Sequence, residues 1–237
     1  MDEDTSKTRF GAVVVAAGVG SRMGTGSPKQ YELIGGKTML EHSVEALLRE
    51  PRISELVLVI SPSDILGQRL VFKDSRVKIA RVGGQTRADS VKNGILFSDL
   101  TSSDWVLVHD AARPCLLTSD VTKLIDFCQE HRKGAILAVP VNDTLKKEGE
   151  HDLIEKTVER NGLWAAQTPQ CFQVGELTRA MSEAGSAITD EASALEFVGK
   201  HPALVEGTPT NLKVTRPMDL WLAKAIFMAR EAGDKNE

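Results

Sequence analysis

The sequence predicts an α/β fold in which helices cover both faces of a mainly parallel β-sheet. Short, strongly apolar segments recur along its 237 residues, and segments with helical spacing of apolar residues lie between them. Such alternation is typical of parallel strands joined by crossover helices. The length allows a large core, and we expect one domain over residues 1–237.

The first predicted strand is the continuous apolar run at residues 10–17, FGAVVVAA, which is typical of a strand buried on both faces. Four further β-rich segments follow, at residues 56–60, 77–82, 105–109 and 135–139. Apolar residues at helical spacing predict helices over residues 40–48, 91–96, 121–128, 174–183 and 191–198. A last amphipathic helix is expected to start after Pro217, because proline is well placed at a first helical turn. Together these elements predict a Rossmann-like sheet.

The alternation breaks at residues 142–161, which are mostly charged and contain few aliphatic side chains. Glu148, Gly149 and Glu150 form the expected turn of a protruding β-hairpin, here called the arm. A two-stranded hairpin is marginal alone in water, so the arm should pack on its own body or on a second subunit. We favour a second subunit, which makes the arm a dimerisation element.

Composition excludes several classes of protein. The chain carries 29 Lys and Arg against 33 Asp and Glu, a formal net charge of −4, without a block of consecutive basic residues. This argues against nucleic acid as a partner. The three cysteines form no CxxC pair, and the first apolar run is too short to span a membrane. We therefore expect a cytoplasmic protein with no membrane partner.

A glycine-rich loop follows the first strand directly, at residues 16–24. Glycines there let backbone N–H groups approach a bound phosphate. The loop is not a dinucleotide fingerprint, because Met23 stands where the third glycine belongs, and Tyr31 similarly breaks a P-loop pattern. Arg22 and Lys29 add the positive charge that a polyphosphate under attack requires. By itself, the loop could equally be a glycine turn with two solvated cations.

Two more polar patches follow predicted strands. Residues 83–90, GGQTRADS, open a helix and offer amides and hydroxyls to a base or sugar, although a simple helix cap is the alternative. In the second patch, residues 108–114, Asp110 suits a divalent cation or substrate hydroxyls, and Arg113 suits a phosphate. His109 is interpreted as a structural histidine, because no serine and carboxylate complete a triad.

Eight motifs in one order resemble the 2-C-methyl-D-erythritol 4-phosphate cytidylyltransferase family. They are AAGxGxRM (16–23), PKQY (28–31), RxDSV (87–91), VHDAARP (108–114), RNGLW (160–164), QTPQ (167–170), TDEAS (189–193) and KVT (213–215). The resemblance implies attack by a phosphate oxygen of methylerythritol phosphate on the α-phosphate of CTP, with release of pyrophosphate, in non-mevalonate isoprenoid biosynthesis. It implies Mg²⁺ as the cofactor, and Asp110 is the one carboxylate that we expect near the metal.

The resemblance also implies a role for individual residues. The implied catalytic cations are Arg22, Lys29 and Lys213. The implied nucleotide-binding residues are Ala16, Ala17, Gly18, Gly20, Gly84, Arg87 and Ser90. The implied acceptor-binding residues are Asp110, Arg113, Thr144, Arg160, Thr168, Thr189 and Lys213, with Thr144 and Arg160 delivered by the arm of a partner in a homodimer.

Two alternatives stay open on the sequence alone. The first is a ribitol 5-phosphate cytidylyltransferase, because both acceptors present hydroxyls and one phosphate. The second is a nucleotide-sensing module without catalysis. Retention of Arg22, Lys29, Asp110 and Lys213 argues against a sensor, which needs affinity but no stabilisation of an attacked phosphorus.

Overall fold

The computed structural model describes residues 9–18, 28–185 and 188–234. Within them, seven strands form one sheet in the order β11-β7-β10-β6-β1-β4-β5. Its strands are β1 (Phe10–Val15), β4 (Ile53–Val59), β5 (Val77–Ala80), β6 (Trp105–Asp110), β7 (Ala135–Pro140), β10 (Trp164–Gln173) and β11 (Ala203–Glu206). Only β10 runs antiparallel to its neighbours β6 and β7, so the described sheet is mainly parallel, as predicted.

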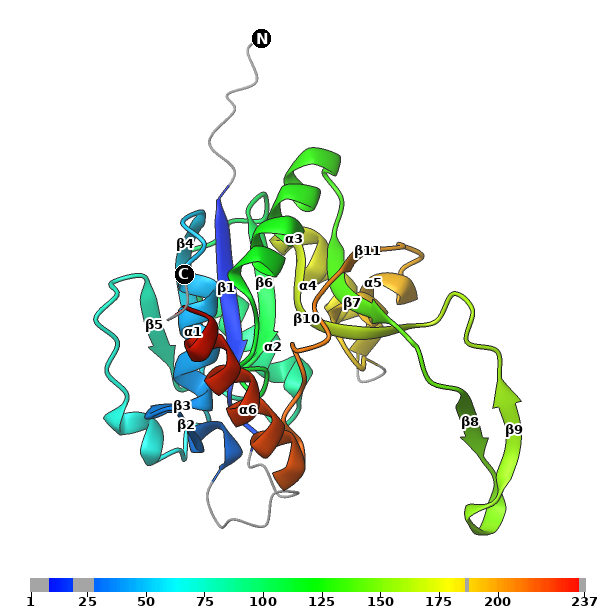
Figure 1. The fold of residues 1–237 in the computed structure, drawn as a ribbon. Coiled ribbons are helices and arrows are strands. Elements are labelled where there is room, and N and C mark those ends of the chain that lie inside the picture. Colours follow the sequence, from blue (N-terminus) through cyan, green and yellow to red (C-terminus); the bar gives the residue numbers. More distant parts are fainter. Residues whose placement is uncertain (1–8, 19–27, 186–187, 235–237) are drawn as a thin grey trace.

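Helices cover both faces of this sheet (Figure 1). They are α1 (Met39–Leu48), α2 (Arg87–Phe97), α3 (Thr118–His131), α4 (Val174–Ala184), α5 (Glu191–Phe197) and α6 (Pro217–Asp234). Short 3₁₀ turns occur at Lys29–Tyr31, Leu66–Arg69 and Glu150–Asp152. None of the helices in the described ranges has the length and apolar character that a bilayer crossing requires.

The apolar run of β1 explains why helices cover the sheet on both faces. Phe10, Ala12 and Val14 enter one core cluster with α1 and α3, whereas Val13 enters a second cluster with α2, α4 and α5. Successive side chains of a strand point to opposite faces, so a run with no polar residue requires an apolar layer on each side. A third, smaller cluster joins α6 to Ile34 and Met39.

The strands and helices expected from the sequence are all present, with boundaries that differ by at most a few residues. Two strands of the main sheet, β10 and β11, were not predicted. β10 contains the polar QTPQ motif, and a proline argues against a central strand. The ladder accommodates Pro169 because its register with β7 breaks between Ala166 and Gln170. A small hairpin of β2 (Leu33–Ile34) and β3 (Lys37–Thr38) was also not predicted.

The arm is a hairpin of β8 (Leu145–Glu148) and β9 (Ile154–Val158). Figure 1 shows it extending away from the body of the molecule. Most of its side chains are exposed, including Leu153 and Ile154 at 67% and 65%. The arm therefore has no apolar support within the described part of this chain.

Candidate active site

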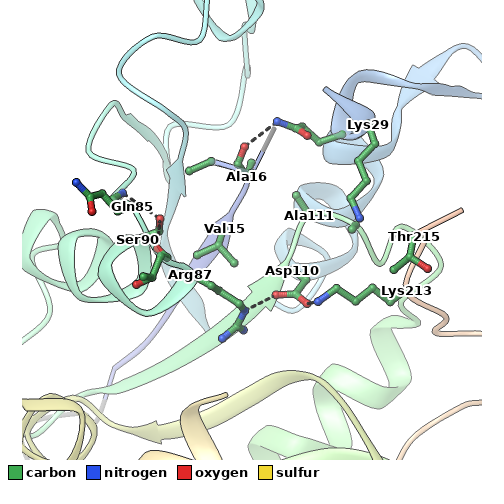
Figure 2. Close-up of a pocket in the computed structure, with 16 residues that line it drawn as sticks. Val15, Ala16, Lys29, Gln85, Arg87, Ser90, Asp110, Ala111, Lys213 and Thr215 are labelled. Carbon is green, nitrogen blue, oxygen red and sulfur yellow. Dashed lines mark hydrogen bonds and ion pairs between the residues drawn. The ribbon is translucent and has the colours of Figure 1, made fainter. Parts of the chain in front are cut away.

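A cavity of about 330 Å³ opens at the carboxyl edge of the sheet, where β1 and β6 end and α2 begins (Figure 2). Its walls come from residues 15–18, 29–30, 84–87 and 110–112, together with Ser90, Lys213 and Thr215. The carboxyl ends of parallel strands are the usual place for ligands in open α/β sheets. Most of the predicted site residues of the described chain meet here.

The first wall is formed by Ala16, Ala17 and Gly18, directly after β1. The Ala16 carbonyl accepts a hydrogen bond from Gln30 Nε2 at 2.8 Å, which joins the loop to the 3₁₀ turn that carries Lys29. Gln30 is only 4% exposed and was not predicted as a site residue, although it lies inside the PKQY motif. The predicted residues Gly20 and Arg22 fall outside the described residues.

Lys29 and Lys213 bring two ammonium groups to the same cavity. Lys29 Nζ donates to the Val214 carbonyl at 2.7 Å, and Lys213 Nζ lies 2.7 Å from Asp110 Oδ2. The hydrogen bond from Lys29 to Val214 thus holds Lys29 next to Lys213, which is 184 positions further along the chain. In Figure 2 both side chains lie along the wall that also carries Thr215, another lining residue that was not predicted.

The opposite wall is the loop that opens α2. The N–H of Gly84 donates to Ser90 Oγ at 3.1 Å, and Ser90 Oγ donates to the Thr86 carbonyl at 3.0 Å. A Cβ on Gly84 would lie 2.2 Å from Cβ of Asp89, so only glycine allows this close turn. Ser90 therefore shapes the loop with its side chain while lining the cavity, as Gly84 does.

Asp110 lies between two cations at the end of β6. Its Oδ1 accepts from Arg87 Nε at 2.8 Å, and its Oδ2 faces Lys213 (Figure 2). Burial alone would raise the pKa of Asp110, but the charges of Arg87 and Lys213 outweigh burial and hold this pKa well below its usual range. Asp110 is therefore ionised at neutral pH and organises both cations.

Sequence reasoning missed the second partner of Arg87, the carboxylate of Glu191. Arg87 Nη1 and Nη2 donate to the two Glu191 oxygens at 2.6 and 3.0 Å. Burial raises the pKa of Glu191, which is 0% exposed, and the charge of Arg87 opposes that rise. Burial lowers the pKa of Arg87, but Glu191 and Asp110 raise it beyond its usual value. The signal in the sequence was the TDEAS motif, in which Asp190 caps α5 and Glu191 is its first residue.

Arg113 and Thr168 lie beside Asp110 without lining the cavity. Arg113 donates to the carbonyls of Asn211 at 2.7 Å and Ala166 at 3.3 Å, and its buried Nε has no hydrogen-bond partner among the described residues. Thr168 Oγ1 accepts from the Asp110 N–H at 3.1 Å and lies 3.0 Å from His109 Nδ1. His109 is fully buried and has a partner on each ring nitrogen, which is typical of a structural histidine.

Three further predicted acceptor-binding residues, besides Arg113 and Thr168, do not line the cavity. Thr144 and Arg160 are exposed on the arm, and Arg160 donates to the Asn142 carbonyl. Thr189 is exposed just before α5, where its N–H donates to Ser193 Oγ at 3.0 Å. The described residues therefore bring the loops at residues 16–18 and 84–87 and the Asp110–Lys213 pair to one cavity, but not these three side chains.

The residues present could supply only part of the coordination shell of a divalent cation. Asp110 is the one carboxylate among the described lining residues, and the described ranges contain no cluster of three or more His, Cys, Asp or Glu side chains suited to a metal. Mg²⁺ commonly takes one or two carboxylates and completes its shell with phosphate oxygens and water. This donor set fits a Mg²⁺ that arrives with a polyphosphate.

The fold and the cavity define an α/β protein whose cationic cavity, where parallel strands end, suits a phosphorylated ligand. The family model for 2-C-methyl-D-erythritol 4-phosphate cytidylyltransferase matches residues 10–229. The chain belongs to this family, as the eight motifs indicated.

Individual relatives agree with this assignment. The 2-C-methyl-D-erythritol 4-phosphate cytidylyltransferase of Vibrio parahaemolyticus is 49% identical over 226 residues, which cover 94% of this chain and 96% of that protein. The Escherichia fergusonii protein of the same name is 50% identical over 230 residues, with coverage of 95% and 96%. A crystal structure of 4-diphosphocytidyl-2C-methyl-D-erythritol synthase has a TM-score of 0.82 and 41% identity, covering 93% of this chain and all of that one. The Thermus thermophilus enzyme has a TM-score of 0.77 and 30% identity, with coverage of 92% and 98%.

Proposed function

We propose that the protein transfers the cytidylyl group of CTP to 2-C-methyl-D-erythritol 4-phosphate, giving 4-diphosphocytidyl-2-C-methyl-D-erythritol and pyrophosphate for isoprenoid biosynthesis. The observation that carries this proposal is that Lys29, Asp110 and Lys213 line the same cavity as the backbone of residues 16–18 and 84. Such a cavity accepts a nucleoside triphosphate at one end and a second anion at the other. The family membership supports the choice of both substrates.

The nucleotide end is built mainly of backbone. Ala16, Ala17 and Gly18 face Gly84 and Ser90 across the cavity, and Arg87 closes the wall beyond them. A narrow space with backbone donors and acceptors favours a pyrimidine, because a purine needs more room. We assign the cytidine of CTP to this end.

The acceptor end is defined by charge. Lys213 attracts the acceptor phosphate, and Asp110 accepts hydrogen bonds from polyol hydroxyls. We assign Arg113, Thr168 and Thr189 to the same acceptor, since the first two lie directly beside Asp110. A phosphate oxygen of the acceptor forms a bond to the α-phosphorus while the bond from that phosphorus to the bridging oxygen of pyrophosphate breaks.

The chain contributes positioning and positive charge rather than a covalent intermediate. Lys29 and Lys213 counter the charge that grows on the attacked phosphoryl group, and the resemblance adds Arg22 from the glycine-rich loop. A Mg²⁺ bound to the triphosphate would neutralise part of that charge, with Asp110 as the nearby protein carboxylate. Fixed cations in a cavity shielded from water stabilise the transition state more than mobile ions in solvent.

We also propose that the arm completes the site in a homodimer. The exposed apolar side chains Leu153 and Ile154 support this role, because they have no cover within the described chain. Thr144 and Arg160 would then reach the acceptor end of a second copy.

The test is a coupled assay for pyrophosphate release with CTP and either 2-C-methyl-D-erythritol 4-phosphate or ribitol 5-phosphate. We expect rapid release with the first acceptor and slow release with the second. Faster turnover of ribitol 5-phosphate would change the assigned acceptor. Binding of CTP without pyrophosphate release from either acceptor would favour a nucleotide-sensing module instead.

A further inference from the structure

We propose that Glu191 is a positioning residue of this site, which holds Arg87 so that Asp110 and Lys213 present their charges to the cavity. The inference rests on the proposed function for its kinetic test, and on geometry alone for its structural test. Glu191 does not line the cavity and touches no expected substrate, so its effect passes through Arg87.

The geometry divides the donors of Arg87 between two carboxylates. Nη1 and Nη2 lie 2.6 and 3.0 Å from the oxygens of Glu191, and Nε lies 2.8 Å from Asp110 Oδ1. Asp110 Oδ2 then remains for Lys213, at 2.7 Å. Glu191, Arg87, Asp110 and Lys213 thus form a row of alternating charges that starts in the core and ends at the cavity (Figure 2 shows its last three members).

Loss of the Glu191 charge would change which carboxylate oxygens pair with Arg87 and Lys213. In Glu191→Gln an NH2 donor replaces one of the two Glu191 oxygens, so one Nη group of Arg87 would lose its acceptor. Asp110, which already accepts from Arg87 Nε, offers a second carboxylate oxygen, Oδ2, which now faces Lys213. Arginine binds a carboxylate best through two parallel hydrogen bonds. Arg87 would therefore take both oxygens of Asp110, and Lys213 would lose its anchor at the acceptor end.

The start of α5 does not need Glu191. Asp190 caps this helix by accepting from the Ser193 N–H, and Gln170 Oε1 accepts from the Ala192 N–H. A buried ion pair is also weak evidence for stability, since removing two charges from water costs about as much as their attraction returns. The position of Glu191 is thus explained by what it does to Arg87.

The kinetic test compares Glu191→Gln with a matched control, Glu50→Gln. Glu50 is 2% exposed and holds Arg52 through Nε at 2.7 Å and Nη2 at 3.1 Å, just before β4 and away from the lining residues of the cavity. We expect both variants to lower the melting temperature. Only Glu191→Gln should raise the KM for the acceptor phosphate, by about tenfold or more, and it should raise the KM for CTP less, because Arg87 also borders the nucleotide end.

A double variant tests whether Glu191 acts through Arg87. We expect the double variant Arg87→Met with Glu191→Gln to have the same kcat/KM as Arg87→Met alone. Glu191 affects Asp110 only through Arg87, so its substitution should have no further effect once Arg87 is absent. Separate losses that multiply in the double variant would overturn the proposal. So would kinetics of Glu191→Gln that match those of Glu50→Gln.

Two further measurements keep the proposal testable whatever the first result. If Glu191→Gln does not fold, Glu191→Asp keeps the charge but is one methylene shorter, and we expect an intermediate rise in the acceptor KM. Unchanged kinetics would contradict the proposal.

A crystal structure of folded Glu191→Gln should show Arg87 bound to both oxygens of Asp110 and Lys213 turned away. An unchanged Arg87 would overturn the proposal even if the assigned substrates are wrong, whereas failure of the wild-type assay alone would overturn only the proposed function.

Discussion

At the scale of single residues, Asp110 shows how the site depends on its neighbours. Its carboxylate receives a cation from the start of α2 and another from the segment before α6. Without them, burial would raise the pKa of Asp110 and favour its neutral form. The chemistry assigned to this residue therefore belongs to a cluster of four side chains rather than to one.

Lys29 provides the first prediction. Lys29→Ala should lower kcat by about 10² to 10³, because a fixed cation beside the attacked phosphoryl group stabilises the transition state more than the bound substrate. Steady-state pyrophosphate release at varied CTP is the measurement, and the KM for CTP should change far less. Lys37→Ala is the matched control, since Lys37 is an exposed lysine paired with Glu45 on the surface. Equal kcat in the two variants would remove Lys29 from the mechanism.

His109 provides a prediction about pH. Burial lowers the pKa of His109 from 6.5 to about 4, so the unfolded chain binds a proton at this residue before the native protein does. The free energy of unfolding should therefore fall by up to ~3 kcal/mol as the pH falls from about 6.5 to 4. Urea unfolding at several pH values measures this slope. His109→Asn should flatten it, whereas substitution of the exposed His201 by Asn should leave it unchanged; a slope kept in His109→Asn would assign it to other groups.

At the scale of elements, α2 couples packing to the cavity. Its first turn lines the cavity, and Gly94 in its middle lies against β1 and β4. A Cβ at this position would come within 2.6 Å of Val59 Cγ2 and 2.7 Å of Val13 Cγ1. Both valines are buried and β-branched, so neither can move aside without displacing a strand.

Gly94→Ala should therefore destabilise the protein by about 1 to 3 kcal/mol, although alanine favours helix over glycine. Because the displaced helix carries Arg87 and Ser90, the KM for CTP should rise as well. Chemical denaturation and initial-rate kinetics give the two values. Gly233→Ala in α6, where nothing lies within 4 Å of the new Cβ, should be neutral or slightly stabilising. A stable Gly94→Ala with an unchanged KM would show that α2 tolerates displacement.

At the scale of the whole molecule, the proposed site is incomplete in one chain. Figure 1 shows the arm extending away from the body. Thr144 and Arg160 flank the strands of this arm, whereas Asp110 and Lys213 line the cavity. If the arm serves a second copy, each active site needs one residue set from each chain. Two different inactive variants should then complement each other.

Mixing Arg160→Ala with Asp110→Asn should restore activity that neither variant has alone. In a mixed dimer, the body with intact Asp110 receives the arm with intact Arg160, so random exchange of subunits should return about one quarter of the wild-type rate. Subunit exchange is verified by tagging one variant, and pyrophosphate release gives the rate. No recovery in verified mixed dimers would mean that Arg160 does not contribute to the active site of the partner chain.

Much of the fold could be predicted because its signal is local. The apolar run of β1, the helical spacing of α1 to α3 and Pro217 at the start of α6 each express a periodicity or a conformational preference of adjacent residues. β10 could not be predicted in this way. Its polar residues are buried because β6 and β7 flank it on both sides, and that placement depends on segments more than 20 residues away.

The sequence by itself determined the order of the six helices and of five strands of the main sheet, the sheet edge at which a ligand is expected, and the family, through motifs whose residues are contiguous. Only the tertiary structure decided which charges meet: Lys29 with the segment of Lys213, and Arg87 with both Asp110 and Glu191. The physical reason is that periodicity and loop chemistry act between near neighbours in the chain. Ion pairs over 23 and 104 positions form only after the core clusters have fixed where each element ends.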